Sequence, residues 1–379
     1  MNFLLREMIE IIEVNTEALR KEFALIPYRL YQGNPYWVPP MLQGEINDIT
    51  PEKNPYFRFC EAKFWIAKRG QKTVGRIGAI IHHAYIEKTQ ERLGRLTRCE
   101  FIDDAEVVDA LFDTAENWCK EKGMIGVLGP LGFSNLDQQG LLVEGFDRLA
   151  SVASAYHHEY YHRHFERLGF TKEMDWVEFR LALSRQIPEK AIRMEQAIMQ
   201  RYQLKVVDIK NKKMLRHYGQ QVFQLLNKSF HNLFSFVALD EAMIEAVLDN
   251  YLPVINTEFV KLVMTQDERI VGFIVPVPSL SKTMQIAKGK LGLRALISLL
   301  WSRRHNDTID TFLTGVDPEF QSKGVVGLLM TSAQRVMIKR NMLTVETTGM
   351  LENNQKAIEF WKNYDHIQHK RKRCYRKMF

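Results

Sequence analysis

The stretch IDTFLTGVDPEFQSKGVVGLLMTSAQR, residues 309–335, decides the fold that we expect for this chain. Residues 309–316 predict a strand, Pro318 lies in a predicted turn, and residues 328–339 predict a helix. A glycine-containing turn that leads into a helix leaves several backbone N–H groups without partners inside the helix. These donors, the positive end of the helix dipole and the Lys323 cation suit a bound phosphate. The alternative is an ordinary strand-to-helix turn whose glycines only allow close packing.

This stretch resembles the loop that binds the pyrophosphate of acyl-CoA in the GNAT superfamily of N-acyltransferases. The family pattern is a strand, a turn that often contains Pro-Glu, and [Gln/Arg]-x-x-Gly-x-[Gly/Ala] at a helix start. Gln321, Gly324 and Val326 occupy the three pattern positions, so Val326 departs from the pattern. The resemblance implies that acetyl-CoA or another acyl-CoA binds here as a cosubstrate. The cofactor-binding residues that it implicates are Gly315, Val316, Gln321, Ser322, Lys323, Gly324, Val325, Val326, Gly327 and Asn354.

Composition is that of an ordinary globular protein. A length of 379 residues with 46% hydrophobic and 26% charged residues predicts two or three domains. The net charge of +7 suits an anionic ligand such as a nucleotide cofactor, and by itself it does not imply nucleic acid, which we do not expect as a partner. Four cysteines without a C-x-x-C pair favour reduced thiols. Residues 1–15 do not resemble a signal peptide, and the apolar run 295–301 is too short to cross a bilayer, so we expect a cytoplasmic protein without a transmembrane segment.

The two halves of the chain share one order of predicted elements. This indicates a repeat of a whole α/β unit. We expect a mixed α/β (α+β-like) fold of two tandem GNAT-like domains, residues 1–190 and 191–379, each with a mixed, mostly antiparallel sheet flanked by helices. The first half predicts strands at 8–14, 62–69, 73–82, 126–129 and 176–183 and helices at 17–31, 105–122 and 159–168. The second half predicts strands at 204–209, 258–265, 269–277, 309–316, 343–347 and 370–377 and helices at 212–228, 239–252, 328–339 and 353–363, after a connecting helix at 186–203.

Motifs in the first half extend the resemblance beyond the loop. The segments NPYWVPP at 34–40, GRI at 75–77, Gly129-Pro130 and GLLVEGF at 140–146 are similar to those of the YghO-like group of bacterial tandem GNAT proteins. That resemblance implies an acyltransferase fold and leaves the substrate open.

The helix start of the first half differs from that of the second. It has no glycine, and it carries Asp103, Asp104 and Glu106. These carboxylates cap the helix themselves and repel a pyrophosphate. We therefore expect only residues 191–379 to bind acyl-CoA, whereas the first half is structural or helps to hold the acceptor.

Acyl transfer to an amine needs a base, and the leaving thiolate needs an acid. Asp310, on the strand before the loop, and Glu346, on the next strand, are candidate bases, because the GNAT fold separates two strands here to admit the pantetheine arm. In many family members a tyrosine of the last helix is the acid, but here that position is Trp361. Tyr364 lies near the same face if the helix continues and is the candidate acid, with a simple core aromatic as the alternative.

The predicted function is therefore transfer of an acetyl or other acyl group from acyl-CoA to a small-molecule or peptide amine. The departures at Val326 and Trp361 favour an alternative, a non-catalytic acyl-CoA-binding or regulatory protein. A second alternative is a zinc hydrolase, because residues 158–162 spell His-Glu-Tyr-Tyr-His, which on a helix places two histidines for zinc. The surrounding residues resemble the closing helix of a GNAT domain, so we expect no metal.

Two basic segments remain. The insert at 286–304 is amphipathic and could touch a membrane surface or form a lid over the acceptor pocket, and we expect a packed lid. The tail at 369–373 is a run of charges for which we expect a solvated edge strand rather than a nucleic-acid site.

Overall fold

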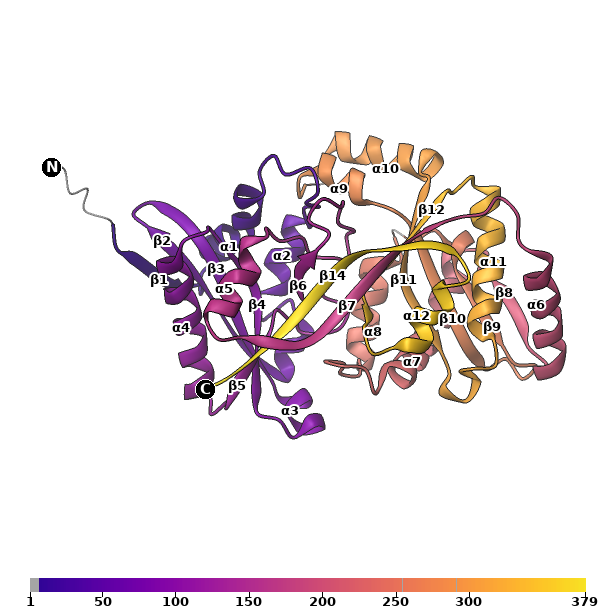
Figure 1. Cartoon of the computed structure of the whole chain (residues 1–379), viewed down its shortest axis with the longest axis horizontal. Coiled ribbons are helices and arrows are strands. Elements are labelled where there is room, and N and C mark those ends of the chain that lie inside the picture. Colours follow the sequence, from indigo (N-terminus) through magenta and orange to yellow (C-terminus); the bar gives the residue numbers. More distant parts are fainter. Residues whose placement is uncertain (1–6, 254, 291) are drawn as a thin grey trace. The chain divides into compact units, whose positions relative to one another are not determined.

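A computed structural model describes residues 7–253, 255–290 and 292–379 (Figure 1). The chain divides into two compact units. Unit 1 comprises Met1–Val177, Leu280–Leu299 and His369–Phe379, and unit 2 comprises Glu178–Ser279 and Leu300–Gln368. Each unit is a mixed sheet flanked by helices, which confirms the predicted fold class.

The sheet of unit 1 has the strand order β1-β2-β3-β4-β5-β14-β7. Neighbours from β1 to β4 pair antiparallel, β4 and β5 are parallel, and β5 pairs antiparallel with β14. The strands are β1 (Ile9–Glu13), β2 (Cys60–Arg69), β3 (Lys72–His82), β4 (Leu93–Phe101), β5 (Gly126–Gly129), β6 (Leu141–Glu144), β7 (Thr171–Ala182) and β14 (Asp365–Met378). The helices are α1 (Glu17–Leu30), α2 (Leu42–Asp48), η1 (Pro55–Arg58), α3 (His83–Thr89), α4 (Ala105–Glu121), α5 (Tyr160–Arg167) and α9 (Ser281–Ala287).

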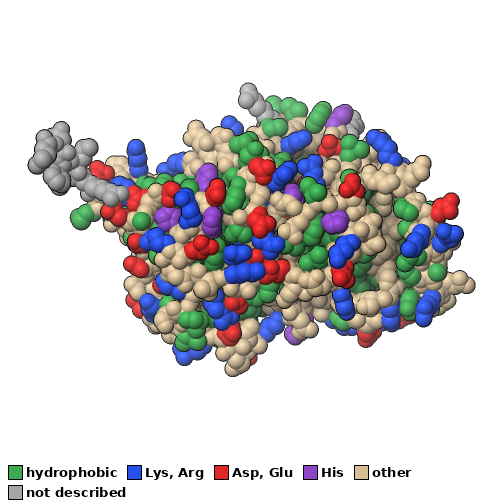
Figure 2. All heavy atoms as spheres, viewed as in Figure 1, with side chains coloured by type: hydrophobic (Ala, Val, Ile, Leu, Met, Phe, Trp, Pro, Cys, Tyr) green, Lys and Arg blue, Asp and Glu red, His purple; other side chains and the backbone are tan. Residues whose placement is uncertain are grey.

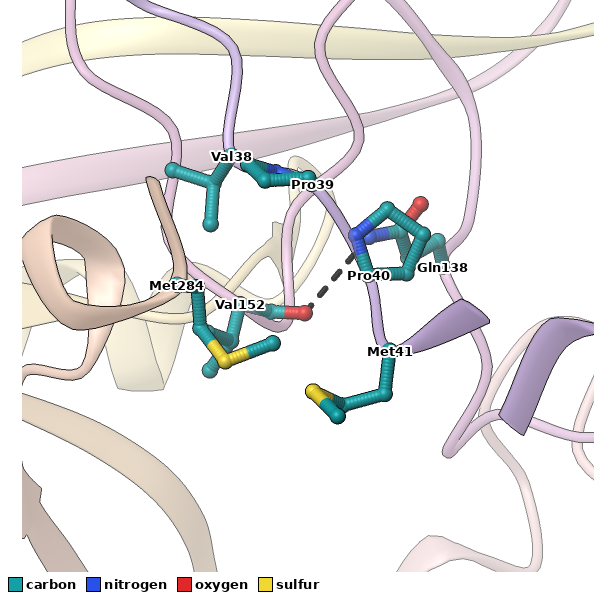
Figure 3. Close-up of a pocket in the computed structure, with 7 residues that line it drawn as sticks. All are labelled: Val38, Pro39, Pro40, Met41, Gln138, Val152 and Met284. Carbon is teal, nitrogen blue, oxygen red and sulfur yellow. Dashed lines mark hydrogen bonds between the residues drawn. The ribbon is translucent and has the colours of Figure 1, made fainter. Parts of the chain in front are cut away.

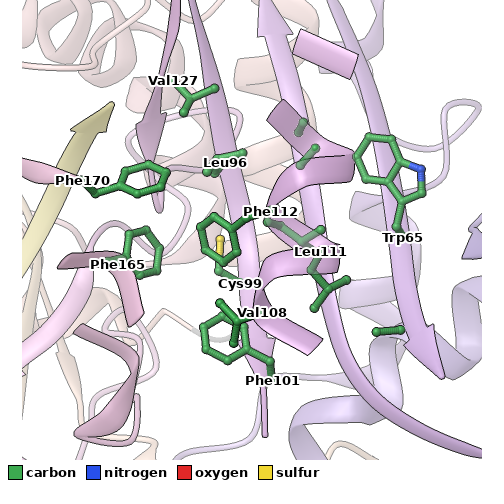
Figure 4. Close-up of a cluster of buried hydrophobic side chains, with 14 of the residues drawn as sticks. Trp65, Leu96, Cys99, Phe101, Val108, Leu111, Phe112, Val127, Phe165 and Phe170 are labelled. Atoms are coloured by element: carbon green, nitrogen blue, oxygen red, sulfur yellow. The ribbon is translucent and has the colours of Figure 1, made fainter. Parts of the chain in front are cut away.

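The main core of unit 1 lies between its sheet and α4 (Figure 4). Apolar residues of α4 recur at helical spacing, so one face of the helix is buried against the strands. Phe112 of α4 packs edge-on against Phe165 and Phe170, with ring centroids 5.1 and 5.6 Å apart. Gly75 lets α4 pack closely on β3, because a Cβ at this position would lie 2.7 Å from a methyl group of Leu111 on α4.

The sheet of unit 2 has the order β7-β12-β11-β10-β9-β8, in which only β11 and β12 are parallel among the pairs with a described register. Its further strands are β8 (Lys205–Asp208), β9 (Lys261–Met264), β10 (Ile270–Pro278), β11 (Thr308–Val316), β12 (Thr344–Thr347) and β13 (Met350–Leu351). Its helices are α6 (Glu189–Tyr202), α7 (Lys212–Phe230), α8 (Glu241–Tyr251), η2 (Thr257–Phe259), η3 (Pro318–Phe320), α11 (Val325–Lys339) and α12 (Gln355–Trp361). The helix α10 (Leu293–His305) has residues in both units.

The repeat predicted from the sequence appears as a shared strand–helix–strand module. In unit 1, β4 and β5 are parallel and α4 connects them, and in unit 2, β11 and β12 are parallel and α11 connects them. The long strands β7 and β14 contribute residues to both units, so the chain segments of the two units interleave.

The predicted solvated edge strand at 369–373 is wrong. In the sheet order β14 lies between β5 and β7, and Lys370 and Lys372 are only 2% and 3% exposed. The amino group of Lys370 donates a hydrogen bond to the carbonyl oxygen of Leu149 at 3.2 Å. A basic run can therefore be buried when the fold supplies oxygen acceptors from distant parts of the chain.

Candidate functional site

The loop between β11 and α11 has the geometry of an anion site at a helix start. Gly324 is the N-cap of α11, and its φ of +79° is in the left-handed region that suits glycine. A Cβ on Gly324 would also lie 2.4 Å from the Cδ1 atom of Ile198 in α6. The positive φ is what favours glycine here, because the end of the Ile198 side chain can move, and α11 begins at Val325, three residues before the helix predicted from residue 328.

The first turn of α11 presents backbone donors. The N–H groups of Val325, Val326 and Gly327 have no carbonyl acceptor within the helix. Among the described residues they make no backbone hydrogen bond outside it either. Val325 is buried against β10, whereas Val326 and Gly327 are half-exposed. A Cβ on Gly327 would meet no atom within 4 Å, so space remains beside these donors.

Basic groups surround the loop, and both of its acidic residues, Asp317 and Glu319, are paired, Glu319 with the guanidinium of Arg269 at 3.1 Å. The Lys323 ammonium lies 4.5 Å from the ring centroid of Phe320. Asp317 accepts from the Lys228 amino group at 3.0 Å and from the backbone N–H of Glu319 at 3.0 Å. Burial raises the pKa of Asp317, but these two hydrogen bonds outweigh it and hold the pKa below its usual value. The loop therefore keeps a positive character beside the helix dipole.

The strand that precedes the loop has an open edge. The ladder between β11 and β12 ends at the pair Thr311–Thr347 within the described chain, whereas β11 continues to Val316. On the other side, β11 pairs with β10 across a bulge that leaves Phe312 as the extra residue. Residues 313–316 thus pair with β10 along one edge, whereas the opposite edge of residues 312–316, which include the predicted Gly315 and Val316, has no ladder with β12. This open edge leads directly into the loop at Asp317.

The two candidate bases are brought together at the start of the open edge. Asp310 and Glu346 are register partners in the parallel β11–β12 pair, so their side chains lie on the same face of the sheet. Asp310 is buried, and Glu346 lies 3.5 Å from the guanidinium of Arg180 on β7. The sequence predicted both acids but not their direct partnership.

Two charged residues of β7 near the candidate bases were missed. Arg180 pairs with Glu346 in the register of β7 and β12, and the buried Glu178 lies two residues before it, on the same face. The alternation of Glu178 and Arg180 with apolar Val177, Phe179 and Leu181 is a sequence signal that could have indicated them.

The candidate acid Tyr364 lies beyond the last helix. α12 ends at Trp361, so in this described segment the helix does not continue to Tyr364 as predicted. Even so, the Tyr364 N–H donates to the Trp361 carbonyl at 2.9 Å, and the two rings lie 5.9 Å apart. Burial raises the pKa of Tyr364. Asn354, predicted to bind cofactor, caps α12 by accepting from the Ala357 N–H at 3.4 Å.

In unit 1 the corresponding helix start is occupied by its own side chains. Asp104 is the N-cap of α4 and accepts from the Glu106 N–H at 3.0 Å. The guanidinium of Arg69 binds Asp104 at 2.8 Å and Glu106 at 3.1 Å. The chain after β5 also returns to β4, because the N–H of Leu131 donates to Leu96 at 2.8 Å and buried Arg95 donates to the Gly132 carbonyl at 3.0 Å.

Unit 1 contains a small apolar cavity of about 190 Å³ (Figure 3). Met41 follows the rigid Val38-Pro39-Pro40 segment, and Met284 of α9 lies across from it. Gln138 supplies the polar group of the lining and donates to the Val152 carbonyl at 3.5 Å. Because methionine side chains adapt their shape, such a lining accommodates flexible aliphatic groups. The lining residues are Val38, Pro39, Pro40, Met41, Gln138, Val152 and Met284.

The His-Glu-Tyr-Tyr-His motif does not lie on one helix. His158 precedes α5, and its ring lies 3.2 Å from the Leu30 carbonyl oxygen, whereas His162 stacks on Phe146. Across the part of the chain that the structure describes, no group of three or more His, Cys, Asp or Glu residues is placed to hold a metal ion.

Two global features bear on partners. On the face in view in Figure 2, Lys and Arg side chains lie among Asp and Glu side chains. None of the helices in the described residues is both long enough and apolar enough to cross a bilayer.

These features define a tandem GNAT fold, in which each unit carries the parallel strand pair joined by a helix. A tandem GNAT protein from the clavulanic acid biosynthesis pathway shares this fold, with a TM-score of 0.54, 12% sequence identity and coverage of 98% of both chains. The chain is thus a tandem GNAT-fold protein, as the sequence predicted.

Two relatives match nearly the whole chain in sequence. It is 27% identical over 380 residues to a bacterial ceramide synthase of Caulobacter vibrioides, covering 97% of both chains. It is 26% identical over 364 residues to the protein YghO of Escherichia coli, covering 94% of this chain and 92% of the relative. No protein-family model matches the sequence. The predicted resemblance to the YghO-like group is confirmed, and together with the fold it supports an acyltransferase in general.

Proposed function

We propose that this protein transfers an acyl group from acyl-CoA to an amine, with the acyl-CoA bound by unit 2. One observation carries the proposal: the open edge at 312–316 leads directly into a helix start with backbone donors. The two amides of a pantetheine arm can pair with an exposed strand edge, as a peptide does in strand addition. The pyrophosphate would then reach the N–H groups of Val325, Val326 and Gly327, with Lys323 beside it.

The reaction needs only proton transfers and one exchange of bonds. The amine nitrogen attacks the thioester carbonyl carbon, a C–N bond forms and the C–S bond breaks, and CoA leaves as a thiolate. Glu346 or Asp310 accepts the proton that the amine loses, directly or through one water. Arg180 orients the Glu346 carboxylate. Tyr364 supplies the proton that converts the thiolate to a thiol.

The acceptor that we propose is an amine with a long hydrocarbon chain. One relative is named a ceramide synthase, and a ceramide is the amide of a fatty acid and a long-chain amino alcohol. The apolar cavity of unit 1 is a candidate site for part of such a chain, because six of its seven lining residues are apolar. We place the protein in the cytoplasm, where acyl-CoA is available.

Binding is tested first, with CoA and acyl-CoAs of increasing chain length. A ligand at 100 times its Kd stabilises the folded state by about 2.7 kcal/mol, which raises Tm measurably. Gly327→Asp should weaken CoA binding by about tenfold more than the isosteric, neutral Gly327→Asn, because its carboxylate lies beside the pyrophosphate. Both variants should fold, since a Cβ there meets open space. Equal binding by both variants would contradict the loop assignment.

Turnover is tested with a thiol-release assay and a long-chain amino alcohol as acceptor. One of the variants Glu346→Gln and Asp310→Asn removes the base. That variant should lower kcat by about 100-fold and leave the Kd of acyl-CoA unchanged. Arg180→Gln is the matched control and should act more weakly through the orientation of Glu346. Tight acyl-CoA binding without thiol release, for short and long amines alike, would favour a non-catalytic acyl-CoA-binding protein.

A further inference from the structure

The segment that contains α9 and α10 is basic and carries no acid. Between Glu268 and Asp307 the sequence has no Asp or Glu. A segment with an excess of positive charge and no acid of its own attracts an anionic surface. Residues 281–305 contain six cations, namely Lys282, Lys288, Lys290, Arg294, Arg303 and Arg304.

The same segment exposes a stripe of large apolar side chains. Leu293, Ile297 and Trp301 recur at intervals of four on one face of α10 and are 74%, 58% and 60% exposed. Ser298, about 100° around the helix from Ile297, instead faces α9, where its hydroxyl lies 3.3 Å from that of Thr283. The packed lid expected from the sequence would bury the apolar stripe, but here the apolar stripe is exposed and a polar contact joins the helices.

The combination of these features fits a lipid bilayer better than a protein. An interfacial helix inserts a short apolar stripe, often with Trp, at the boundary between headgroups and acyl chains, and its basic residues meet anionic headgroups. A protein partner needs shape-matched polar groups around the apolar stripe. A fluid bilayer needs none, and the cations in this segment match its surface charge.

We propose that α9 and α10, orange in Figure 1, dock this protein on an anionic lipid bilayer through Leu293, Ile297 and Trp301. The inference does not depend on the proposed chemistry. Docking on a bilayer would also supply aliphatic ligands to the apolar cavity of unit 1. Met284 of α9 lines that cavity, and Ile286, two residues later, is exposed. The segment that contacts lipid would thus also form one wall of a site for an aliphatic chain.

The experiment is co-sedimentation of the full chain with vesicles of phosphatidylcholine alone or with phosphatidylglycerol added. The wild type should bind the anionic vesicles more tightly, and added salt should weaken binding. Ile297→Asn and Trp301→Ala should each reduce the partition coefficient by about tenfold. Ile125→Asn is the matched control, because Ile125 is 52% exposed outside this segment, and it should bind like wild type. Thermal unfolding confirms that each variant folds.

Two outcomes would overturn the proposal. The first is that neither kind of vesicle binds the wild type, or that Ile297→Asn and Ile125→Asn bind alike. The second is that the wild type forms a dimer or larger oligomer in solution that Trp301→Ala dissociates, because the stripe would then be an interface between copies of this chain. The Tm shift with CoA needs no vesicle and is unaffected in either case, so failure of docking is distinguishable from failure of the acyltransferase proposal.

Discussion

His82, at the end of β3, is a buried histidine that the fold keeps neutral. Its Nδ1 atom accepts the Tyr85 N–H at 3.3 Å and so caps α3. Burial, reinforced by the nearby charge of Arg95, lowers the pKa of His82 from 6.5 to about 3. Between these two pH values the unfolded chain binds a proton at His82 that the folded chain does not bind. The contribution of His82 to the free energy of unfolding is therefore fully present above pH 6.5, and it is lost as the pH falls from 6.5 towards 3.

This linkage gives a pH prediction. The free energy of unfolding of the wild type should fall relative to that of His82→Asn by about 1.4 kcal/mol per pH unit below pH 6.5. Urea titrations of both proteins at several pH values measure the difference, which cancels the contributions of groups common to both. His217→Asn is the control, because His217 is exposed on α7. Parallel stability curves for wild type and His82→Asn would show that His82 is not held neutral.

At the scale of single residues, the sequence predicted chemistry better than position. Gly324 was predicted from the resemblance to the acyl-CoA loop, and the structure adds a physical reason, because a φ of +79° at the helix start suits glycine. Asp310 and Glu346 were predicted as strand residues, but their register depends on where α11 ends, which the local pattern does not reveal. The distance of Tyr364 from the end of α12 was likewise not predictable, because a helix of seven residues ends where packing of Trp361 against Met350 fixes it.

Among the elements, the strands that the sequence analysis missed are β4, β6 and β13, and β4 is the longest of them. Its residues include Arg95 and Arg98, which interrupt the apolar pattern expected of a central strand. The structure buries Arg95 by giving it the Gly132 and Phe133 carbonyls, and Arg98 binds Glu45 and Asp48 of α2 at 3.2 and 3.0 Å. These partners are more than thirty residues away in sequence, so no local pattern could indicate them.

The helices α4 and α11 give a prediction at this scale, since they begin in opposite ways. Saturating CoA should slow hydrogen exchange of the amides of residues 325–328 and leave those of residues 105–108 unchanged. Asp104→Ala should lower the free energy of unfolding by about 1 kcal/mol through loss of the cap. It should not create a second CoA site, because the Glu106 carboxylate remains at the helix start, paired with Arg69, and the chain after β5 still pairs with β4. Protection at residues 105–108 would refute this division between the helices.

At the scale of the whole molecule, the division of the chain into residues 1–190 and 191–379 stays a prediction, and the structure adds that segments interleave. Unit 1 includes His369–Phe379, which no local pattern assigns to the first half. In that segment Cys374 and Tyr375 are buried, and the Tyr375 ring lies 5.1 Å from that of Phe165. Lys377 also binds both carboxylate oxygens of Glu116 in α4 at 2.8 Å.

Removal of residues 369–379 should therefore unfold unit 1. Loss of a buried aromatic such as Tyr375 alone costs about 3–5 kcal/mol, and the β5 ladder and the Lys377–Glu116 pair are lost with it. Circular dichroism and thermal scans of the shortened chain should show no cooperative transition from unit 1. Removal of Phe379 alone is the control and should change Tm little, because that residue is partly exposed at the end of the segment. A shortened chain that unfolds like wild type would contradict this role of β14.

The place of β14 also has a consequence for biosynthesis. Residues 369–379 are synthesised after every other segment of unit 1, so the sheet of unit 1 stays incomplete until they have been made. Until then β5 lacks its partner β14, and an unpaired strand edge can pair with other chains. A stop codon shortly before residue 369 would therefore remove only a small part of the chain and still leave unit 1 without its β14 segment.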